Sequence, residues 1–396
     1  MKISLRAQGI NPSPTLAIDA KAKQMVKEGI DIVGFGAGEP DFDTPEVIKS
    51  EAISSLKKGE TKYTPASGTL ALKEAVCFKM ERDHNLKYGS NQVIICCGAK
   101  HALYNLFQVI CDPGDEVIIP APYWVSYSEQ VAVTGAKPVI IPTNENSGFK
   151  MTAEQFREAV TPKTVALVLN SPSNPTGAVY TKQELAAIAQ VAVERKITVV
   201  SDEIYEKLVY ESEHISIASL GPEIKDLTII INGVSKTFSM TGWRIGYAVG
   251  DAKVIKAMSD LQSHSTSNPT TFCQPASVLA LKNPPTDVIE AMVAEFKKRR
   301  DYMVATVNNI PGLSCLKPAG AFYVFASIKG LIGKEFFGKE VNDSDCLAEL
   351  LLEHAKVAVV PGTGFGAPEY IRLSYATSFQ NIERGLARIA EFVAGS

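Results

Sequence analysis

The sequence predicts an α/β protein: a large domain on a mostly parallel, seven-stranded sheet covered by helices on both faces, followed by a smaller α+β domain. Between residues 92 and 250, short apolar runs alternate with helical patterns, as in wound α/β folds. Several runs are apolar on both faces, which is typical of parallel strands between two helical layers. After about residue 281 the pattern changes, and 396 residues accommodate two or three structural units.

The strands expected in the large sheet are short runs rich in β-branched and aliphatic residues. They cover residues 93–97, 116–120, 138–142, 165–170, 198–202, 228–232 and 244–250. Crossover helices are predicted where apolar residues recur at i, i+3, i+4 and i+7. Two sets with this spacing are Leu103, Leu106, Phe107 and Ile110, and Leu185, Ile188, Ala189 and Ala192.

The smaller domain is expected to begin at the Pro284-Pro285 pair, which breaks the preceding helical pattern. A charged helix is predicted over 288–304. Further strands are predicted over 321–325, 357–360 and 371–375, and an amphipathic helix carries Ile382, Leu386, Ile389 and Val393. The first 15 residues are polar and contain prolines, which predicts an extended arm.

Composition narrows the classes of function. Lys plus Arg number 40 and Asp plus Glu number 43, so the net charge is −3, too small to favour nucleic acid or an acidic membrane surface. No apolar run approaches the roughly 18 residues that cross a bilayer, and residues 1–15 lack the apolar stretch of a secretion signal. We therefore expect a cytoplasmic protein without membrane or nucleic-acid partners.

Cysteine and histidine spacing argues against a metal centre. The 7 cysteines are scattered without C-x-x-C spacing, and the 5 histidines show no H-E-x-x-H motif. We expect reduced cysteines, no metal, and chemistry that relies on an organic cofactor. A glycine pattern at 362–367 fits G-x-G-x-x-A, but Pro368 and a strand-like run follow where a dinucleotide site requires a helix.

Five polar side chains of different types are expected at the carboxyl edge of the sheet, where α/β folds place their ligand sites. Asp202 ends one predicted strand, and Tyr205 lies three residues on. Lys236 and Arg244 follow the next strand, and Asn174 lies in the loop after another. Each alone has an ordinary explanation, such as a helix cap, a solvated lysine or a turn. Their joint placement favours a functional site.

These residue types suit pyridoxal phosphate. A lysine kept dry near other positive charge loses its proton readily and can form a Schiff base with an aldehyde. A carboxylate beside a pyridine nitrogen keeps it protonated, which makes the ring an electron sink. The glycine-bearing turn over 97–105 opens a helix whose free N–H groups attract phosphate, and Arg244 offers a bidentate partner. Pro175 after Asn174 allows a cis bond that would aim the amide.

Eight motifs resemble those of the fold type I, class I aminotransferases, and among them the bacterial aspartate aminotransferases of subgroup Ib. The likeness runs nearly end to end. The matching segments are GAGEPDFDTPE (36–46), KYTPASG (62–68), GAKHALYN (98–105), PYWVSY (122–127), NSPSNPTG (170–177), SDEIYE (201–206), SKTFSMTGWRIGY (235–247) and IRLSYA (371–376).

The resemblance implies a role for each matching residue. Lys236 resembles the lysine that forms the internal aldimine and moves the proton, Asp202 the partner of the ring nitrogen, and Trp124 the residue stacked on the ring. Tyr205 and Asn174 would bind O3′ of the cofactor. The phosphate would be held by Gly98, Ala99, Lys100, Ser235 and Arg244. Tyr63 is expected to reach the phosphate in the neighbouring subunit, which implies a homodimer with shared active sites.

Substrate recognition is also implied by the resemblance. Arg372 resembles the arginine that binds the α-carboxylate, and a planar guanidinium suits that group. Gly38, Asn174 and Trp124 would lie beside the substrate. Lys100 would bind the distal carboxylate, since residues 263–270 contain no arginine of the kind that subgroup Ia uses. Asn11 stands where members acting on prephenate carry a lysine, so prephenate ranks lower.

The expected reaction is ping-pong transamination from L-aspartate to 2-oxoglutarate, giving oxaloacetate and L-glutamate. The alternatives are prephenate, aromatic or alanine aminotransferases of the same fold. A pyridoxal-binding regulator is disfavoured, because no basic DNA-binding segment flanks the chain. The resemblance further implies an arm over 1–15, a large domain over 46–283 and a small domain made of 16–45 and 284–396.

Overall fold

The large part of the molecule is built on one seven-stranded sheet. The computed structural model describes residues 1–10 and 14–395. The strand order is β2-β8-β7-β6-β5-β3-β4, and β8 is antiparallel to both neighbours while the other pairs are parallel. The strands are β2 (Val93–Cys96), β3 (Glu116–Ala121), β4 (Lys137–Pro142), β5 (Thr164–Asn170), β6 (Thr198–Asp202), β7 (Thr228–Gly233) and β8 (Gly246–Val249). The expected mostly parallel α/β sheet is therefore confirmed.

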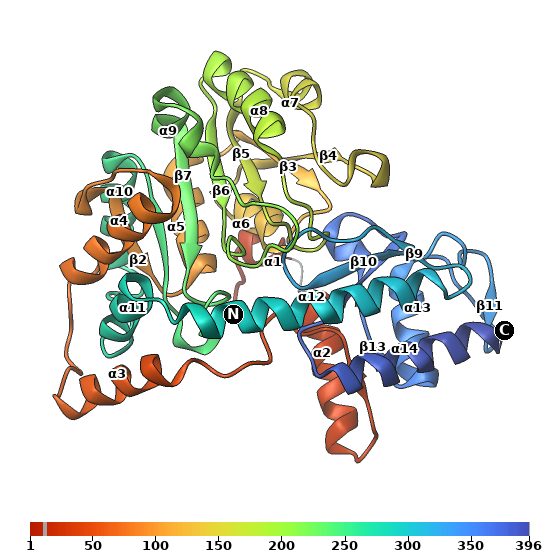
Figure 1. Ribbon diagram of the computed structural model, residues 1–396. Helices are drawn as coiled ribbons and strands as arrows, with labels where there is room; N and C mark the ends of the chain where they lie inside the picture. The colour runs from red at the N-terminus through yellow and green to blue at the C-terminus, as the bar shows by residue number, and fades with distance from the viewer. Residues whose placement is uncertain (11–13, 396) are drawn as a thin grey trace.

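Helices cover both faces of this sheet (Figure 1). Successive strand residues point to opposite faces, so Ile94 packs in one apolar core and Ile95 in another. The first core lies against α5 and α10, and the second against α4 and α11. The helices of this part are α3 (Glu46–Lys57), α4 (Leu70–His84), α5 (Ala99–Ile110), α6 (Ser126–Thr134), α7 (Ala153–Ala159), α8 (Lys182–Arg195), α9 (Pro222–Leu227), α10 (Ala252–Ser263) and α11 (Cys273–Lys282).

A smaller unit lies beside the large sheet, and the long helix α12 runs along both (Figure 1). Its main sheet has the order β14-β15-β10-β9 and is antiparallel. A two-stranded parallel sheet joins β1 (Val33–Gly34) to β13 (Val357–Ala358), so segments from both ends of the chain meet. The other elements are α2 (Pro14–Lys27), α12 (Thr286–Asn308), β9 (Ser314–Cys315), β10 (Tyr323–Ser327), β11 (Glu335–Phe336), β12 (Lys339–Glu340), α13 (Ser344–Leu350), β14 (Val360–Pro361), β15 (Tyr370–Ser374) and α14 (Phe379–Ala394).

Several element bounds differ from those expected, each for a local reason. The strand expected from 244 starts at Gly246, because Arg244 has φ +58° and follows a 3₁₀ turn over Thr241–Trp243. Likewise Ala321 has φ +56°, and β10 starts at Tyr323. The arm is not wholly extended, since Leu5–Gln8 form a helical turn, α1, whose Ala7 N–H donates to the Ser4 hydroxyl at 3.3 Å. Asn11 lies outside the described residues.

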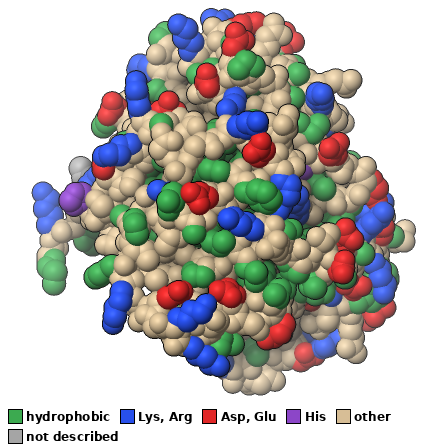
Figure 2. All heavy atoms as spheres, turned by 60° about the vertical axis from the view of Figure 1, so that its left-hand side comes forward, with side chains coloured by type: hydrophobic (Ala, Val, Ile, Leu, Met, Phe, Trp, Pro, Cys, Tyr) green, Lys and Arg blue, Asp and Glu red, His purple; other side chains and the backbone are tan. Residues whose placement is uncertain are grey.

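The described surface mixes both signs of charge. Figure 2 shows Lys and Arg side chains interspersed with Asp and Glu over one face, with apolar side chains between them, as the small net charge leads one to expect. In the described ranges, 1–10 and 14–395, we find no helix long and apolar enough to span a bilayer. This observation does not test whether the protein has a membrane partner, so the expected absence of one stays a prediction.

Candidate active site

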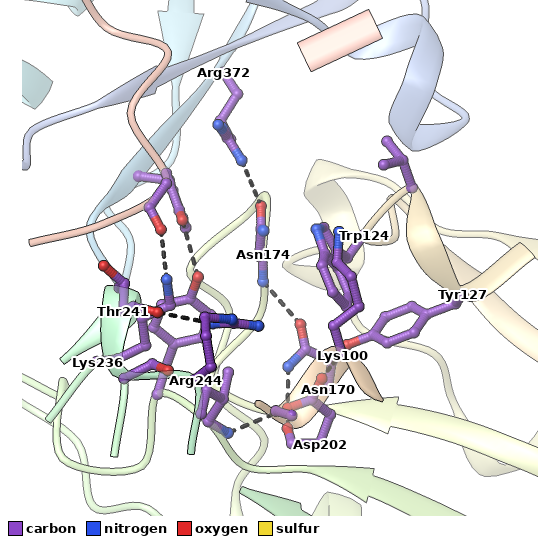
Figure 3. Close-up of a pocket in the computed structure, with 17 residues that line it drawn as sticks. Lys100, Trp124, Tyr127, Asn170, Asn174, Asp202, Lys236, Thr241, Arg244 and Arg372 are labelled. Atoms are coloured by element: carbon purple, nitrogen blue, oxygen red, sulfur yellow. Dashed lines mark hydrogen bonds between the residues drawn. The ribbon is translucent and has the colours of Figure 1, made fainter. Parts of the chain in front are cut away.

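A cavity of about 250 Å³ opens at the carboxyl ends of the central strands (Figure 3). Its walls come from the large sheet, the segment before α3, and β10 and β15 of the smaller unit. The predicted residues that line it are Gly38, Ala99, Lys100, Trp124, Asn174, Asp202, Tyr205, Ser235, Lys236, Arg244 and Arg372. The structure thus brings together eleven of the thirteen residues singled out from the sequence.

Two predicted residues, Gly98 and Tyr63, do not line the cavity. Gly98 is the residue before α5, with φ +89°, and a Cβ built on it would lie 2.4 Å from Arg244 Nη2. Only glycine lets this guanidinium approach the start of the helix. Tyr63 is 91% exposed and lines a different hollow, beside residues of α11. Within this chain, Tyr63 therefore makes no contribution to the cavity.

Lys236 follows β7, in the turn that leads away from the sheet edge. Its Nζ donates to the Gly38 carbonyl at 2.5 Å. Burial lowers the pKa of Lys236 to about 8, with Glu39 opposing that shift and Arg372 and Arg244 adding to it. A substantial fraction of this amine is therefore neutral near physiological pH, as a nucleophile or a proton acceptor requires.

Asp202 ends β6 and is 3% exposed. Burial raises the pKa of this carboxyl to about 6, although two hydrogen bonds favour the ionised form. The Tyr127 hydroxyl donates to Oδ2 at 2.7 Å and the Ile204 N–H donates to Oδ1 at 3.2 Å. These two donors fix the orientation of the carboxylate, which is suited to a cationic partner inside the cavity.

The cavity contains guanidinium groups without anionic partners. Arg244 donates to the carbonyls of Thr241 at 2.8 Å and Cys97 at 3.2 Å. Arg372 donates to the Asn174 side chain and to the Gly36 carbonyl, both at 3.0 Å, while its buried Nε has no partner. Within residues 1–10 and 14–395, neither guanidinium forms an ion pair. Such an arrangement is complementary to ligands with several negative charges.

Lys100 adds a third positive charge at the start of α5. Its Nζ lies 4.7 Å from the centre of the Trp124 ring. Burial and the neighbouring Arg244 lower the pKa of Lys100. The side chains of Lys100 and Trp124 come together in Figure 3, on the side of the cavity away from Lys236.

Six lining residues were missed by sequence reasoning, of which Val125 and Ile204 are apolar and four carry polar side chains. Asn170 accepts from the Asn174 N–H at 2.9 Å and donates to the Asp202 carbonyl at 3.0 Å, which joins three segments of the site. The other three polar residues are Tyr127, Thr241 and Tyr323. Tyr127 belongs to the PYWVSY motif and lies three residues after Trp124, about one helical turn away. That spacing could have indicated that Tyr127 also faces the cavity. The Asn174-Pro175 bond is cis, as the sequence allowed.

A second group of titratable side chains lies behind Asp202. His84, which is distant in sequence, and Glu203, Glu206 and His214 offer ligand atoms within 4.8 Å of one another. The Lys79 ammonium, however, lies 2.5 Å from Glu206 Oε2 and 3.0 Å from His84 Nε2. Burial opposes ionisation of Glu206, but Lys79 and His84 hold its pKa well below the usual value. The Lys79 ammonium therefore supplies a positive charge opposite the Glu206 carboxylate.

Fold and site together indicate an α/β enzyme, because a cavity at the carboxyl edge of the sheet contains a buried lysine and guanidinium groups complementary to anionic ligands. Residues 30–389 match the family model for aminotransferases of class I and II. The chain is 52% identical to an aspartate aminotransferase of Bacillus subtilis (strain 168), over 99% of both chains. It is 45% identical to a probable aspartate/prephenate aminotransferase of Aquifex aeolicus (strain VF5), over 98% of this chain and 97% of the other.

A solved structure extends the likeness to three dimensions. The aspartate aminotransferase from Rhizobium meliloti superposes with a TM-score of 0.96 at 43% identity, covering 100% of this chain and 99% of the other. The chain belongs to the class I and II aminotransferase family, and it is an enzyme of that class.

Proposed function

We propose that this enzyme holds pyridoxal phosphate in the cavity and transfers an amino group from L-aspartate to 2-oxoglutarate. The observation that carries the proposal is the presence of Lys236, Asp202 and two unpaired guanidinium groups around one small cavity. When bound, pyridoxal phosphate supplies an aldehyde for the amino group and a ring that withdraws electrons from the α-carbon.

The residues present fit that cofactor. The glycine at 98 leaves room for Arg244 beside the first turn of α5, and this pairing of guanidinium and helix N-terminus suits a phosphate. Ser235 and Ala99 also line the cavity. Asp202 would face the ring nitrogen, Tyr205 and Asn174 the ring hydroxyl, and Trp124 the ring face. Lys236 would bind the aldehyde carbon and then hold and return the proton taken from the substrate.

Recognition of aspartate follows from the positive charges that remain. Arg372 would bind the α-carboxylate through its two-pronged guanidinium, next to Gly38 and Asn174. Lys100 would bind the distal carboxylate near Trp124. Enzymes that use aromatic amino acids or alanine as donors, or prephenate as acceptor, would need the same Lys236 and Arg372 and would differ in the distal pocket. A screen of amino donors with 2-oxoglutarate as acceptor tests the proposal, and aspartate is expected to be the preferred donor.

Substitution of Lys100 by Ala is expected to raise KM for aspartate by about 10- to 100-fold, because one hydrogen bond to a charged group is lost. Activity with alanine, which lacks the distal carboxylate, should change within about twofold. Steady-state kinetics with both donors measure this difference. Equal losses with the two donors would assign Lys100 to the cofactor phosphate instead.

The proposed assembly is a homodimer with shared sites. Tyr63 is exposed in one chain, and α3 nearby carries exposed Val47, Ile53 and Leu56, which a partner subunit would cover.

The division into an arm (1–15), a large domain (46–283) and a small domain (16–45 with 284–396) is likewise proposed. The cytoplasmic location expected from the sequence stays a prediction.

A mixing experiment tests the shared site. Tyr63→Ala and Lys236→Ala are each expected to be nearly inactive alone, but a hybrid dimer would contain one intact site. Unfolding and refolding the two variants together should recover up to about a quarter of wild-type activity, since half the dimers are hybrids and each has one working site. No recovery, with hybrid dimers demonstrated by differently tagged chains, would place Tyr63 outside the partner's site.

A further inference from the structure

Tyr323 on β10 lies between two groups of the cavity that come from different parts of the fold. Its side chain is fully buried. The ring centre lies 4.3 Å from Arg372 Cζ, and the hydroxyl lies 2.9 Å from the Tyr205 hydroxyl. Tyr205 follows β6 of the large sheet, whereas Arg372 lies on β15 of the smaller one. Tyr323 therefore contacts both Arg372, proposed to bind the substrate carboxylate, and Tyr205, proposed to bind the cofactor ring hydroxyl.

Arg372 needs such support because its charge is desolvated. The side chain is 2% exposed, and burial lowers its pKa. Its hydrogen bonds go to neutral acceptors, the Asn174 amide and the Gly36 carbonyl. An aromatic face attracts a guanidinium more strongly in a dry site than at a surface. The flat ring also limits the rotations open to the guanidinium, so its edge stays directed into the cavity.

The strand register makes this contact possible. β10 and β15 are antiparallel, and Arg372 pairs with Phe325, two residues along β10 from Tyr323. Tyr323 is therefore the diagonal neighbour of Arg372 on the same face, within reach of a long side chain. The hydroxyl end of the ring extends beyond Arg372 to meet Tyr205.

We propose that Tyr323 is a positioning residue that holds Arg372 with its ring and Tyr205 with its hydroxyl. It thereby fixes the spacing between the group that binds the substrate carboxylate and the group that faces the cofactor. The inference rests on the proposed function, since it assigns Arg372 and Tyr205 those tasks. Neither substrate nor cofactor needs to touch Tyr323 for this role.

Two substitutions separate the ring from the hydroxyl. Tyr323→Phe keeps the ring, so the affinity of the holoenzyme for maleate, a four-carbon dicarboxylate without an amino group, should stay within about twofold, while kcat falls by about threefold or more. Tyr323→Met fills the space without an aromatic face. It should weaken maleate binding and raise KM for aspartate, each by about tenfold or more. Titration calorimetry gives the maleate affinity, and steady-state kinetics give the KM and kcat values.

Tyr370→Met is the matched control. Tyr370 is a buried tyrosine of β15, two residues from Arg372, but it stacks on Phe325 at 4.9 Å and does not line the cavity. Its maleate affinity should equal that of the wild type. Equal affinity in Tyr323→Met, or a tenfold loss in Tyr323→Phe, would overturn the proposal. If Tyr323→Met does not fold, Tyr323→Leu replaces it. Failure of the wild-type enzyme to bind maleate or use aspartate would instead reject the proposed function.

Discussion

Replacement of Lys236 by Ala is expected to lower the transamination rate on the order of 10⁴-fold or more, because one amine would both bind the cofactor covalently and transfer the proton. The structure favours this amine for both tasks. It is buried, it lies in the cavity with Asp202, and burial lowers its pKa to about 8. The rate is measured with aspartate and 2-oxoglutarate at saturating cofactor.

A readout independent of turnover accompanies this experiment. Borohydride reduction of the wild-type holoenzyme should fix the cofactor to Lys236, and mass spectrometry of the digested protein locates the modified peptide. Lys236→Ala should give no modified peptide and lack the wild-type visible absorbance. Lys100→Ala, a lysine of the same cavity, serves as control and should still be modified at Lys236. An unchanged visible spectrum in Lys236→Ala would refute the assignment.

Replacement of Asp202 by Asn is expected to lower kcat by about 100-fold or more while the fold is retained. The amide has the same shape as the carboxylate and still offers an oxygen to Tyr127, so the change removes charge without removing volume. Asp202→Ala should lose at least as much. Tyr127→Phe keeps the carboxylate and removes one of its donors, so its loss should be much smaller. A near-normal rate in Asp202→Asn would show that the ring nitrogen needs no charged partner.

The wild type and Asp202→Asn are also expected to differ in how cofactor binding depends on pH. Burial raises the pKa of Asp202 to about 6 in the free enzyme, and a protonated ring nitrogen would prefer the ionised carboxylate. Binding of the cofactor by the apoenzyme should therefore weaken as the pH falls through about 6. Asp202→Asn should lack this component of the titration. Fluorescence titrations of both apoenzymes over this range measure the difference, and identical profiles would remove Asp202 from the binding step.

Most of the fold was predictable because its signals are local. Thr198–Asp202 begins with three β-branched residues, and it forms β6 with the expected bounds. Carboxyl ends of parallel strands share one edge, so the meeting of Asp202, Lys236 and Asn174 followed from strand positions alone. The positions of Arg372 and Lys100 in the same cavity were expected from the resemblance.

The remaining contacts depend on packing between segments far apart in the chain. Tyr323 looks like any core residue of a short strand, and only the docking of two sheets brings its hydroxyl to Tyr205. His84 and His214 share no sequence motif, yet their rings lie 5.6 Å apart. The start of β8 could not be predicted because it depends on the left-handed backbone conformation of Arg244. Glycine adopts this conformation far more readily than arginine, so the sequence gives no signal for it.

The parallel pairing of β1 with β13 has a consequence for how the chain matures. Val33 pairs with Val357, and the Phe35 ring lies against Gly385 of α14, which comes later still in the sequence. During synthesis the early strand therefore has no native partner until β13 has left the ribosome. Contacts of such long sequence separation form late and slow folding. Until then we expect this segment to be exposed to chaperones and proteases.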